Sequence, residues 1–189
     1  MTEHLGRTVA IGVAGFVLTV ILVASAAAGG LAGALTGSLG GTASASPTTI
    51  PPAYLTAYIA AAASCPGLSW SLLAAIGTVE SDNGTSTAPG VQSGANSAGA
   101  EGPMQFEPAT FDEYAEPVPP GGANPPTPYD ALDAIYAAAR LLCANGASGG
   151  ADITAAVYAY NHSASYVAEV LELAIAYASE GVPSGTTGP

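Results

Sequence analysis

The chain has 189 residues, which is enough for one globular domain with flanking segments. Its formal net charge is −12, from 14 acidic residues against two basic ones, Arg7 and Arg140. A domain this acidic repels phosphate backbones, which argues against nucleic acid as a partner. All acidic residues except Glu3 lie at or after Glu80, so the N-terminal third differs from the rest in composition.

The N-terminal segment contains an apolar stretch, residues 9–28, without a single charged side chain. Such a stretch is long enough to cross a bilayer as a helix, and Arg7 before it predicts that this end stays in the cytoplasm. A cleaved signal peptide is the alternative, because Ala-Ser-Ala at 24–26 and again at 43–45 suits a signal peptidase. The stretch is long for a signal peptide, so we favour a transmembrane anchor over residues 1–28. Either way, the rest of the chain is expected outside the cytoplasm.

The next segment, residues 29–51, is rich in Gly, Ala, Ser and Thr and has no periodicity. This composition is typical of a flexible linker. We expect a globular domain over residues 52–180, which is long enough to bury its own core. Residues 181–189 are expected to be a disordered tail.

The only two cysteines, Cys65 and Cys143, lie far apart in the sequence. In an exported domain, such a pair is more often one structural disulfide than a metal site. Two separate buried thiols are the alternative. Without a nearby CxxC or HxxxH pattern, the ligands are too few for zinc, so we expect no metal site.

The pattern of the expected domain is helical throughout, and no convincing alternating strand occurs. The start signals are Ser69, Asp130, Asp152 and Ser163 or Ser165, which are residues that cap helix N-termini. Gly-containing stretches follow several of the helices as stop signals. The expected helices cover residues 53–64, 69–81, 108–114 and 130–144, and two more begin near 152 and near 163–165.

Glu80 lies on the wrong face of its helix for an ordinary surface charge. It follows Leu73 by seven residues and Ile76 by four, so the three share one apolar face. Partial desolvation there raises the pKa of the carboxyl group, and the negative end of the helix dipole adds to this effect. Such a group can act as a general acid near neutral pH. A surface glutamate at a fraying helix end is the alternative.

Three segments in order resemble one known family. They are 76–84, Ile-Gly-Thr-Val-Glu-Ser-Asp-Asn-Gly, 99–106, Gly-Ala-Glu-Gly-Pro-Met-Gln-Phe, and 158–163, Tyr-Ala-Tyr-Asn-His-Ser. They look like the Glu-Ser, Gly-x-Met-Gln-Phe and Ala-Tyr-Asn motifs of soluble-lytic-transglycosylase-type domains, in the form of exported actinobacterial members. Each motif alone is weak, and the specificity comes from all three in this order.

The resemblance implies an all-α, lysozyme-like domain with a glycan cleft, which acts on bacterial peptidoglycan as a monomer without a cofactor. It assigns the catalytic acid to Glu80. The substrate-binding residues that it implies are Ser81, Met104, Gln105, Tyr160 and Asn161. Tyr158 and Tyr160 are two apart and cannot share a helix face, so Tyr158 is expected in the core and Tyr160 at the cleft.

The implied reaction cleaves the bond between N-acetylmuramic acid and N-acetylglucosamine and leaves a 1,6-anhydro ring. Glu80 first gives a proton to the glycosidic oxygen and then takes one from the sugar's own 6-hydroxyl group. No second carboxylate is required, unlike in the usual glycoside hydrolases. The expected place of action is the outer face of the cytoplasmic membrane or the cell wall.

The sequence departs from the family at Glu101, where many members carry a small or apolar residue. Some relatives also have an Asp- and Gly-rich loop suggestive of calcium, but residues 117–122 read Pro-Val-Pro-Pro-Gly-Gly, so no calcium is predicted. A close rival function is a muramidase of the lysozyme type, with Asp82 or Glu101 activating water. A further rival is a non-catalytic wall-binding or scaffold domain.

Overall fold

The computed structural model describes residues 50–182. The expected membrane anchor or signal peptide, nearly all of the linker and most of the C-terminal tail lie outside the described residues. Within the described part, no helix is both long enough and apolar enough to span a bilayer. The account below concerns this part alone.

Helices form all the regular structure between residues 50 and 182, so the all-α prediction is confirmed for this part. The pairing of Glu101 with Phe106 is an isolated β-bridge and does not extend into a strand. The elements are α1 (Pro52–Ala62), α2 (Trp70–Ser81), α3 (Pro108–Tyr114), α4 (Ala131–Leu142), the π-turn η2 (Cys143–Ala147), the 3-10 turn η3 (Ser148–Gly150), α5 (Ile153–Tyr160) and α6 (Ala164–Glu180).

The predicted N-caps are confirmed. The side chains of Ser69, Asp130, Asp152 and Ser163 each accept a hydrogen bond from a backbone N–H group in the first turn of the following helix. Each bond satisfies a donor that the helix cannot pair internally. Of the two serines considered for the last helix, Ser163 is the cap.

The prediction for the end of the fourth helix was two residues too long. Regular α4 ends at Leu142, and the chain continues as η2, in which Asn145 and Gly146 have non-helical backbone angles. Gly146 has a φ of 125°, which favours glycine. The Asn145 side chain donates to the carbonyl of Leu141, which satisfies one of the carbonyl groups that the helix end leaves free.

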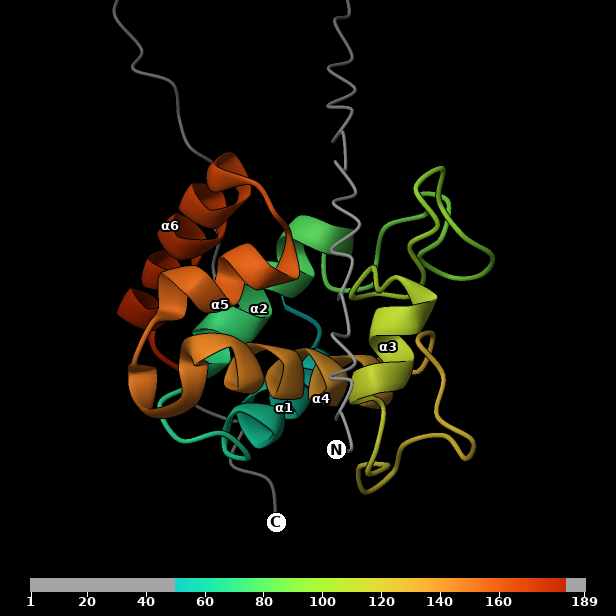
Figure 1. Ribbon diagram of the computed structural model, residues 1–189, viewed down its shortest axis with the longest axis horizontal. Coiled ribbons are helices and arrows are strands. Elements are labelled where there is room, and N and C mark those ends of the chain that lie inside the picture. The colour runs from blue at the N-terminus through green and yellow to red at the C-terminus, as the bar shows by residue number, and fades with distance from the viewer. Residues whose placement is uncertain (1–49, 183–189) are drawn as a thin grey trace, which may run out of the picture. The chain divides into compact units, whose positions relative to one another are not determined.

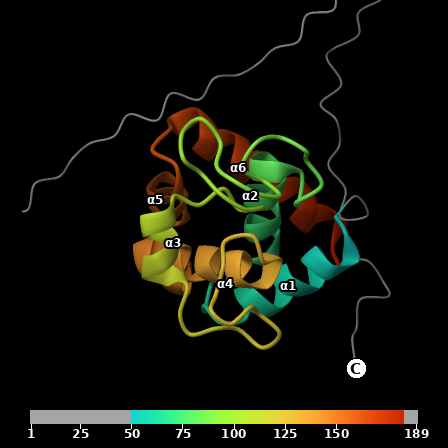
Figure 2. The same ribbon diagram turned by 90° about the vertical axis from the view of Figure 1, so that its right-hand side faces the viewer.

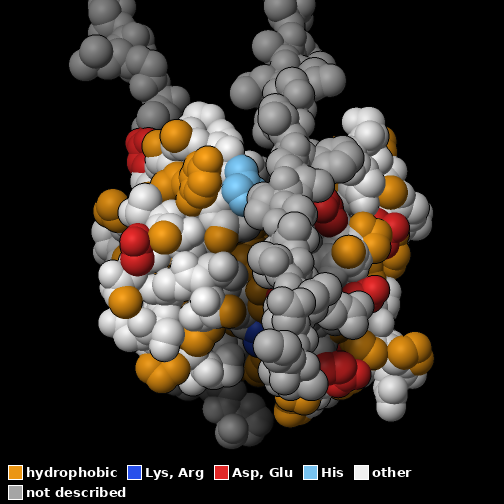
Figure 3. Space-filling view, viewed as in Figure 1, with side chains coloured by type: hydrophobic (Ala, Val, Ile, Leu, Met, Phe, Trp, Pro, Cys, Tyr) orange, Lys and Arg blue, Asp and Glu red, His pale blue; other side chains and the backbone are white. Residues whose placement is uncertain are grey.

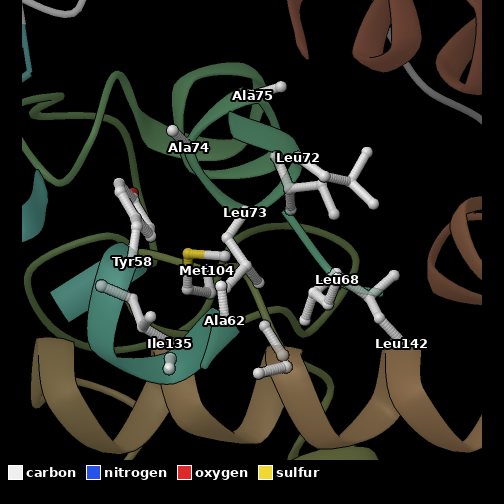
Figure 4. Close-up of a cluster of buried hydrophobic side chains, with 14 of the residues drawn as sticks. Tyr58, Ala62, Leu68, Leu72, Leu73, Ala74, Ala75, Met104, Ile135 and Leu142 are labelled. Atoms are coloured by element: carbon white, nitrogen blue, oxygen red, sulfur yellow. The ribbon is translucent and has the colours of Figure 1, made fainter. Parts of the chain in front are cut away.

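Helix α2 is the centre of the domain (Figures 1 and 2). Residues 71–77 are buried without exception, which is typical of a helix surrounded by other elements. It packs against α1, α4 and α6. Figure 4 shows Tyr58, Leu73, Met104 and Ile135 among the side chains that meet beside it. The C-terminal end of α2 is thereby held in a fixed position.

The two cysteines form a disulfide, which confirms this prediction over separate thiols. Cys65, after α1, is joined to Cys143, after α4, with their Cα atoms 5.9 Å apart. The bond closes a loop with a sequence separation of 78 residues. It therefore ties the first part of the domain to the fourth helix.

The Pro- and Gly-rich segment 116–128 is fastened to α4 by two charged side chains. Asp133 is fully buried, and its Oδ2 accepts from the N–H groups of Ala123 and Thr127. Arg140 donates to the carbonyls of Tyr114, the last residue of α3, and of Ala115 and Pro117 after it. The guanidinium group thus serves to hold the backbone.

Candidate active site

Glu80 lies in the last turn of α2, on the apolar face that the spacing predicted. Leu73 and Ile76 on this face have no exposed surface, while Glu80 is partly exposed. The packing of α2 in the core therefore carries the carboxyl group to a place where the core meets solvent. This is the arrangement that a proton-transferring residue needs.

The pKa of Glu80 is raised to about 7. The largest cause is desolvation, and the negative charge of Glu169 adds to it, while a hydrogen bond from Tyr166 works in the opposite direction. A pKa near neutrality means that the group can both give and accept a proton at that pH. The sequence-based expectation of a raised pKa is confirmed in direction.

Tyr166 is the site residue that the sequence reasoning missed. Its hydroxyl group donates to Glu80 Oε1 over 2.5 Å, from the first turn of α6. Burial and the nearby Glu80 carboxylate raise the pKa of Tyr166 well above its ordinary value, so it stays a donor. The sequence indicates this role only weakly, because a tyrosine three residues after an N-cap can equally well be a core residue.

Ser81 connects the first motif to the second. Its side chain is buried, and Oγ donates to the carbonyl of Pro103 over 2.5 Å. The same oxygen accepts from the backbone N–H of Gly84 over 2.8 Å. Ser81 therefore fixes the end of α2 to the Gly-Pro-Met-Gln turn, although the resemblance implied contact with substrate.

The turn of the second motif places two neighbouring side chains very differently. Met104 is fully buried in the core, so its side chain does not line a cleft as the resemblance implied, and only its backbone belongs to the site. Gln105 is partly exposed and has a φ of 48°, an unusual conformation for a residue other than glycine.

The Gln105 amide is held on both sides. Its Nε2 donates to the carbonyl of Gly102 over 2.7 Å, and its Oε1 accepts from Asn96 over 2.9 Å. Two of the hydrogen-bonding positions of this amide are thus used by the protein. A strained and fixed residue of this kind is more typical of a functional position than of a free surface.

Tyr160 connects the third motif to the second. Its hydroxyl group donates to the carbonyl of Met104 over 2.7 Å, and its ring meets that of Phe106 edge-on. Burial raises the pKa of Tyr160 well above its ordinary value, and the nearby Glu80 charge raises it further. The Tyr160 phenol is therefore within electrostatic reach of the Glu80 carboxyl group.

Asn161 and Tyr158 flank this tyrosine. Asn161 follows α5 and is partly exposed. The expectation that Tyr158 belongs to the core was wrong, because its side chain is 46% exposed and its ring packs against His162. Helix α5 is covered on one side only, so the face opposite Tyr160 meets solvent.

A buried polar network supports the helix end behind Glu80. Asn83 has a φ of 54°, and its amide accepts from the Tyr58 hydroxyl and donates to Thr78 Oγ1. Thr78 Oγ1 is also hydrogen-bonded to the Tyr177 hydroxyl over 2.8 Å. A side chain at Gly77 would collide with Tyr58. Three helices, α1, α2 and α6, are joined in this way next to the candidate catalytic position.

Asp82 and Glu101, the two acidic residues considered as activators of water, have surroundings that differ from those of Glu80. Asp82 is exposed in the C-cap of α2, and its Oδ2 accepts from the Thr85 hydroxyl. Glu101 is partly exposed and exchanges both backbone hydrogen bonds with Phe106. Desolvation raises the pKa of the Tyr129 phenol, and the nearby Glu101 carboxylate raises it further.

Two cavities in the described part lie away from Glu80. One, of about 380 Å³, is lined by residues of the α1–α2 connection, including Cys65 and Trp70. The other, of about 580 Å³, lies between α5 and α6 and includes Tyr158 and Leu171. Among residues 50–182, no three His, Cys, Asp or Glu side chains are grouped so as to hold a metal ion.

These features define an all-helical domain with one partly buried carboxyl group that is suited to general acid and base catalysis. The family model for the transglycosylase SLT domain matches residues 57–179, and the chain belongs to this family. Members of the family are lytic transglycosylases, and the domain implies peptidoglycan as substrate. No curated protein and no solved structure matches the chain.

Proposed function

We propose that this protein is a peptidoglycan lytic transglycosylase. It cleaves the bond between N-acetylmuramic acid and N-acetylglucosamine and forms 1,6-anhydro-N-acetylmuramic acid. The observation that carries the proposal is the Glu80 carboxyl group, partly exposed at the end of a buried helix and with a pKa of about 7. The family membership supports the same conclusion.

In the proposed reaction, Glu80 performs two proton transfers. As an acid, it protonates the glycosidic oxygen, and the bond to the muramic acid anomeric carbon breaks. As a carboxylate, it then takes the proton of the 6-hydroxyl group, whose oxygen closes the anhydro ring on that carbon. The acetamido group of the sugar stabilises the positive charge between the two steps. Glu80 ends protonated, and no water is consumed.

The neighbouring side chains have supporting roles in this proposal. Tyr166 holds one carboxyl oxygen and leaves the other for the sugar. In this proposal Gln105 and Asn161, both partly exposed, bind the glycan. Ser81, Met104 and Tyr160 join the three motifs through hydrogen bonds, so their contribution is to fix the site.

A muramidase on the same fold is the second candidate function. It requires a base that activates water, and Asp82 and Glu101 are the acidic residues of the motif segments besides Glu80. Asp82 is exposed and bonded to Thr85, and Glu101 lies beside Tyr129. Asp82 therefore lacks the partial burial of Glu80. A non-catalytic wall-binding domain is the third candidate, and it gives no reason for the raised pKa.

We also propose that the domain acts outside the cytoplasm as a monomer. It is held at the outer face of the cytoplasmic membrane by residues 1–28, or released to the cell wall if these are cleaved. Fractionation of cells that produce the full chain separates these two cases. Sedimentation analysis of the purified domain tests the monomeric state.

Mass spectrometry of the products from purified peptidoglycan tests the function. The transglycosylase product is lighter than the hydrolase product by one water and has no reducing end. We expect this product from the wild type and from Glu113→Gln, a matched change at an exposed position of α3. Glu80→Gln should give none while keeping its fold. A product with a reducing end shows the muramidase, and no product from any variant shows a non-catalytic domain.

A further inference from the structure

Glu169 adds a second negative charge beside the candidate catalytic group. It lies on α6 three residues after Tyr166, whose hydroxyl group contacts Glu80. Residues three apart on a helix are neighbours on its surface. Tyr166 is buried and Glu169 is exposed, so the Glu169 carboxylate lies at the solvent side of this pair. Its charge acts on both Glu80 and Tyr166, since it raises the pKa of each.

No fixed positive charge offsets these carboxylates within the described part of the chain. Arg140 is the one Lys or Arg between residues 50 and 182, and its guanidinium group is bonded to carbonyls at the end of α3. Figure 3 shows acidic side chains at several places on the face of the molecule that it views. His162, the one histidine between residues 50 and 182, packs against Tyr158.

We propose that Glu169 makes the site selective for glycan strands whose peptide side chains carry amidated carboxyl groups or free amines, and that it disfavours strands whose peptides carry free carboxylates. This inference rests on the proposed function, because it assumes that a peptidoglycan strand binds beside Glu80. It names the chemical class of strand within that substrate.

The expected size follows from the electrostatics of a partly exposed site. A substrate carboxylate at roughly 6–8 Å from Glu169, in a surface-like dielectric, binds about three- to tenfold more weakly than its neutral amide. Because such a pair lies partly in water, salt of about 0.5 M screens most of the difference. A free amine on the peptide carries a positive charge that Glu169 attracts, so a strand with such an amine should bind more tightly still.

The test compares two synthetic glycan strands that differ only in amidation of the peptide carboxyl group. The measured quantity is the ratio of kcat/KM for the amidated strand to that for the free acid, at low salt. We expect a ratio of about three to ten for the wild type and about one for Glu169→Gln. Each variant serves as its own reference, so a change in Glu80 protonation cancels in the ratio.

Glu180→Gln is the matched control. It is the same substitution at an exposed position of the same helix, eleven residues or about 16 Å further along, and should keep the wild-type ratio. Equal cleavage of the two strands by the wild type, or an unchanged ratio in Glu169→Gln, would overturn the inference.

Binding measurements keep the inference separate from the proposed function. Titration calorimetry of the two strands with Glu80→Gln, which cannot cleave, should show the same preference. If the wild type cleaves neither strand but Glu80→Gln binds the amidated strand more tightly, the proposed function fails and the selectivity stands. If the variant binds both equally, the selectivity is wrong whatever the products are.

Discussion

Tyr166 donates a 2.5 Å hydrogen bond to Glu80 across a sequence separation of 86 residues. The contact joins α6 to the end of α2, the two helices that meet most extensively in the domain. It acts on the carboxyl group against desolvation and against the charge of Glu169. The protonation of Glu80 is therefore set by three contributions, of which burial and the Glu169 charge raise the pKa and the Tyr166 hydrogen bond lowers it.

Removing the Tyr166 hydroxyl group should move the activity to higher pH. The hydrogen bond favours the carboxylate, so Tyr166→Phe raises the pKa of Glu80. Because the acid form must protonate the leaving oxygen, activity falls as pH rises through this pKa. In Tyr166→Phe the descending limb of the kcat/KM profile should lie at higher pH than that of the wild type, for which it lies near pH 7.

Removing the Glu169 charge should move the descending limb of the kcat/KM profile to lower pH. A neighbouring negative charge favours the protonated form of Glu80, so Glu169→Gln lowers its pKa and the descending limb lies at lower pH. The pH profile of kcat/KM measures both variants against the wild type. If the two limbs move in the same direction, Glu80 does not control the profile in the way the contacts indicate.

Glu80 should destabilise the fold at alkaline pH. Its pKa is about 7 in the folded protein and 4.5 as a free group, so the folded state binds the proton more tightly. The stability that the protonated Glu80 group contributes is fully present below about pH 4.5 and is lost as pH rises through about 7. Glu80→Gln should therefore be more stable than the wild type at pH 8 by about 2–3 kcal/mol.

Urea unfolding of Glu80→Gln and wild type at pH 5 and pH 8 measures this effect. The difference between the two proteins should be small at pH 5 and favour the variant at pH 8. Equal stability at both values would mean that the carboxyl group is solvated in the folded protein, contrary to its position at the core boundary.

Gly102 should not tolerate a side chain. It has a φ of 75°, and a Cβ atom there would collide with the Pro128 carbonyl of the segment before α4, which approaches the turn closely. Gly94 has a similar φ of 61° but open space around it, so Gly94→Ala measures the conformational cost alone, about 1 kcal/mol. Gly102→Ala should cost at least about 2 kcal/mol more, as measured by urea unfolding.

The disulfide should contribute substantially to stability. It closes a loop with a separation of 78 residues, for which the loop-entropy model gives about 4 kcal/mol. The double variant Cys65→Ser, Cys143→Ser should lose about this amount in urea unfolding. Reductant should destabilise the wild type to a similar degree and leave the double variant unchanged. If reductant also destabilises the double variant, loss of the disulfide does not explain the effect of reductant.

The helices and their starts could be predicted because their determinants are local. An apolar face at helical spacing and a capping side chain act within one or two turns, as at Ser69 and Asp130. The end of α4 was less predictable, since Asn145 and Gly146 permit more than one way to leave a helix. There the packing against the following turns selects the geometry.

The candidate site could be predicted only in part. The face on which the Glu80 side chain lies was predicted from its spacing to Leu73 and Ile76. The resemblance to the family was recognised from the order of the three motifs. The burial of Met104 and the exposure of Tyr158 did not, because both depend on which elements cover which side of a turn or a helix. Tyr166 was missed for the same reason.

The sequence by itself determined that the domain is helical and that one glutamate lies on an apolar helix face. These properties depend on the spacing and the chemical type of nearby residues. Only the tertiary structure decided which tyrosine holds the carboxyl group, and it joined the three motifs through Ser81 and Tyr160. Such contacts join residues far apart in the chain, and their geometry depends on how whole helices pack against one another.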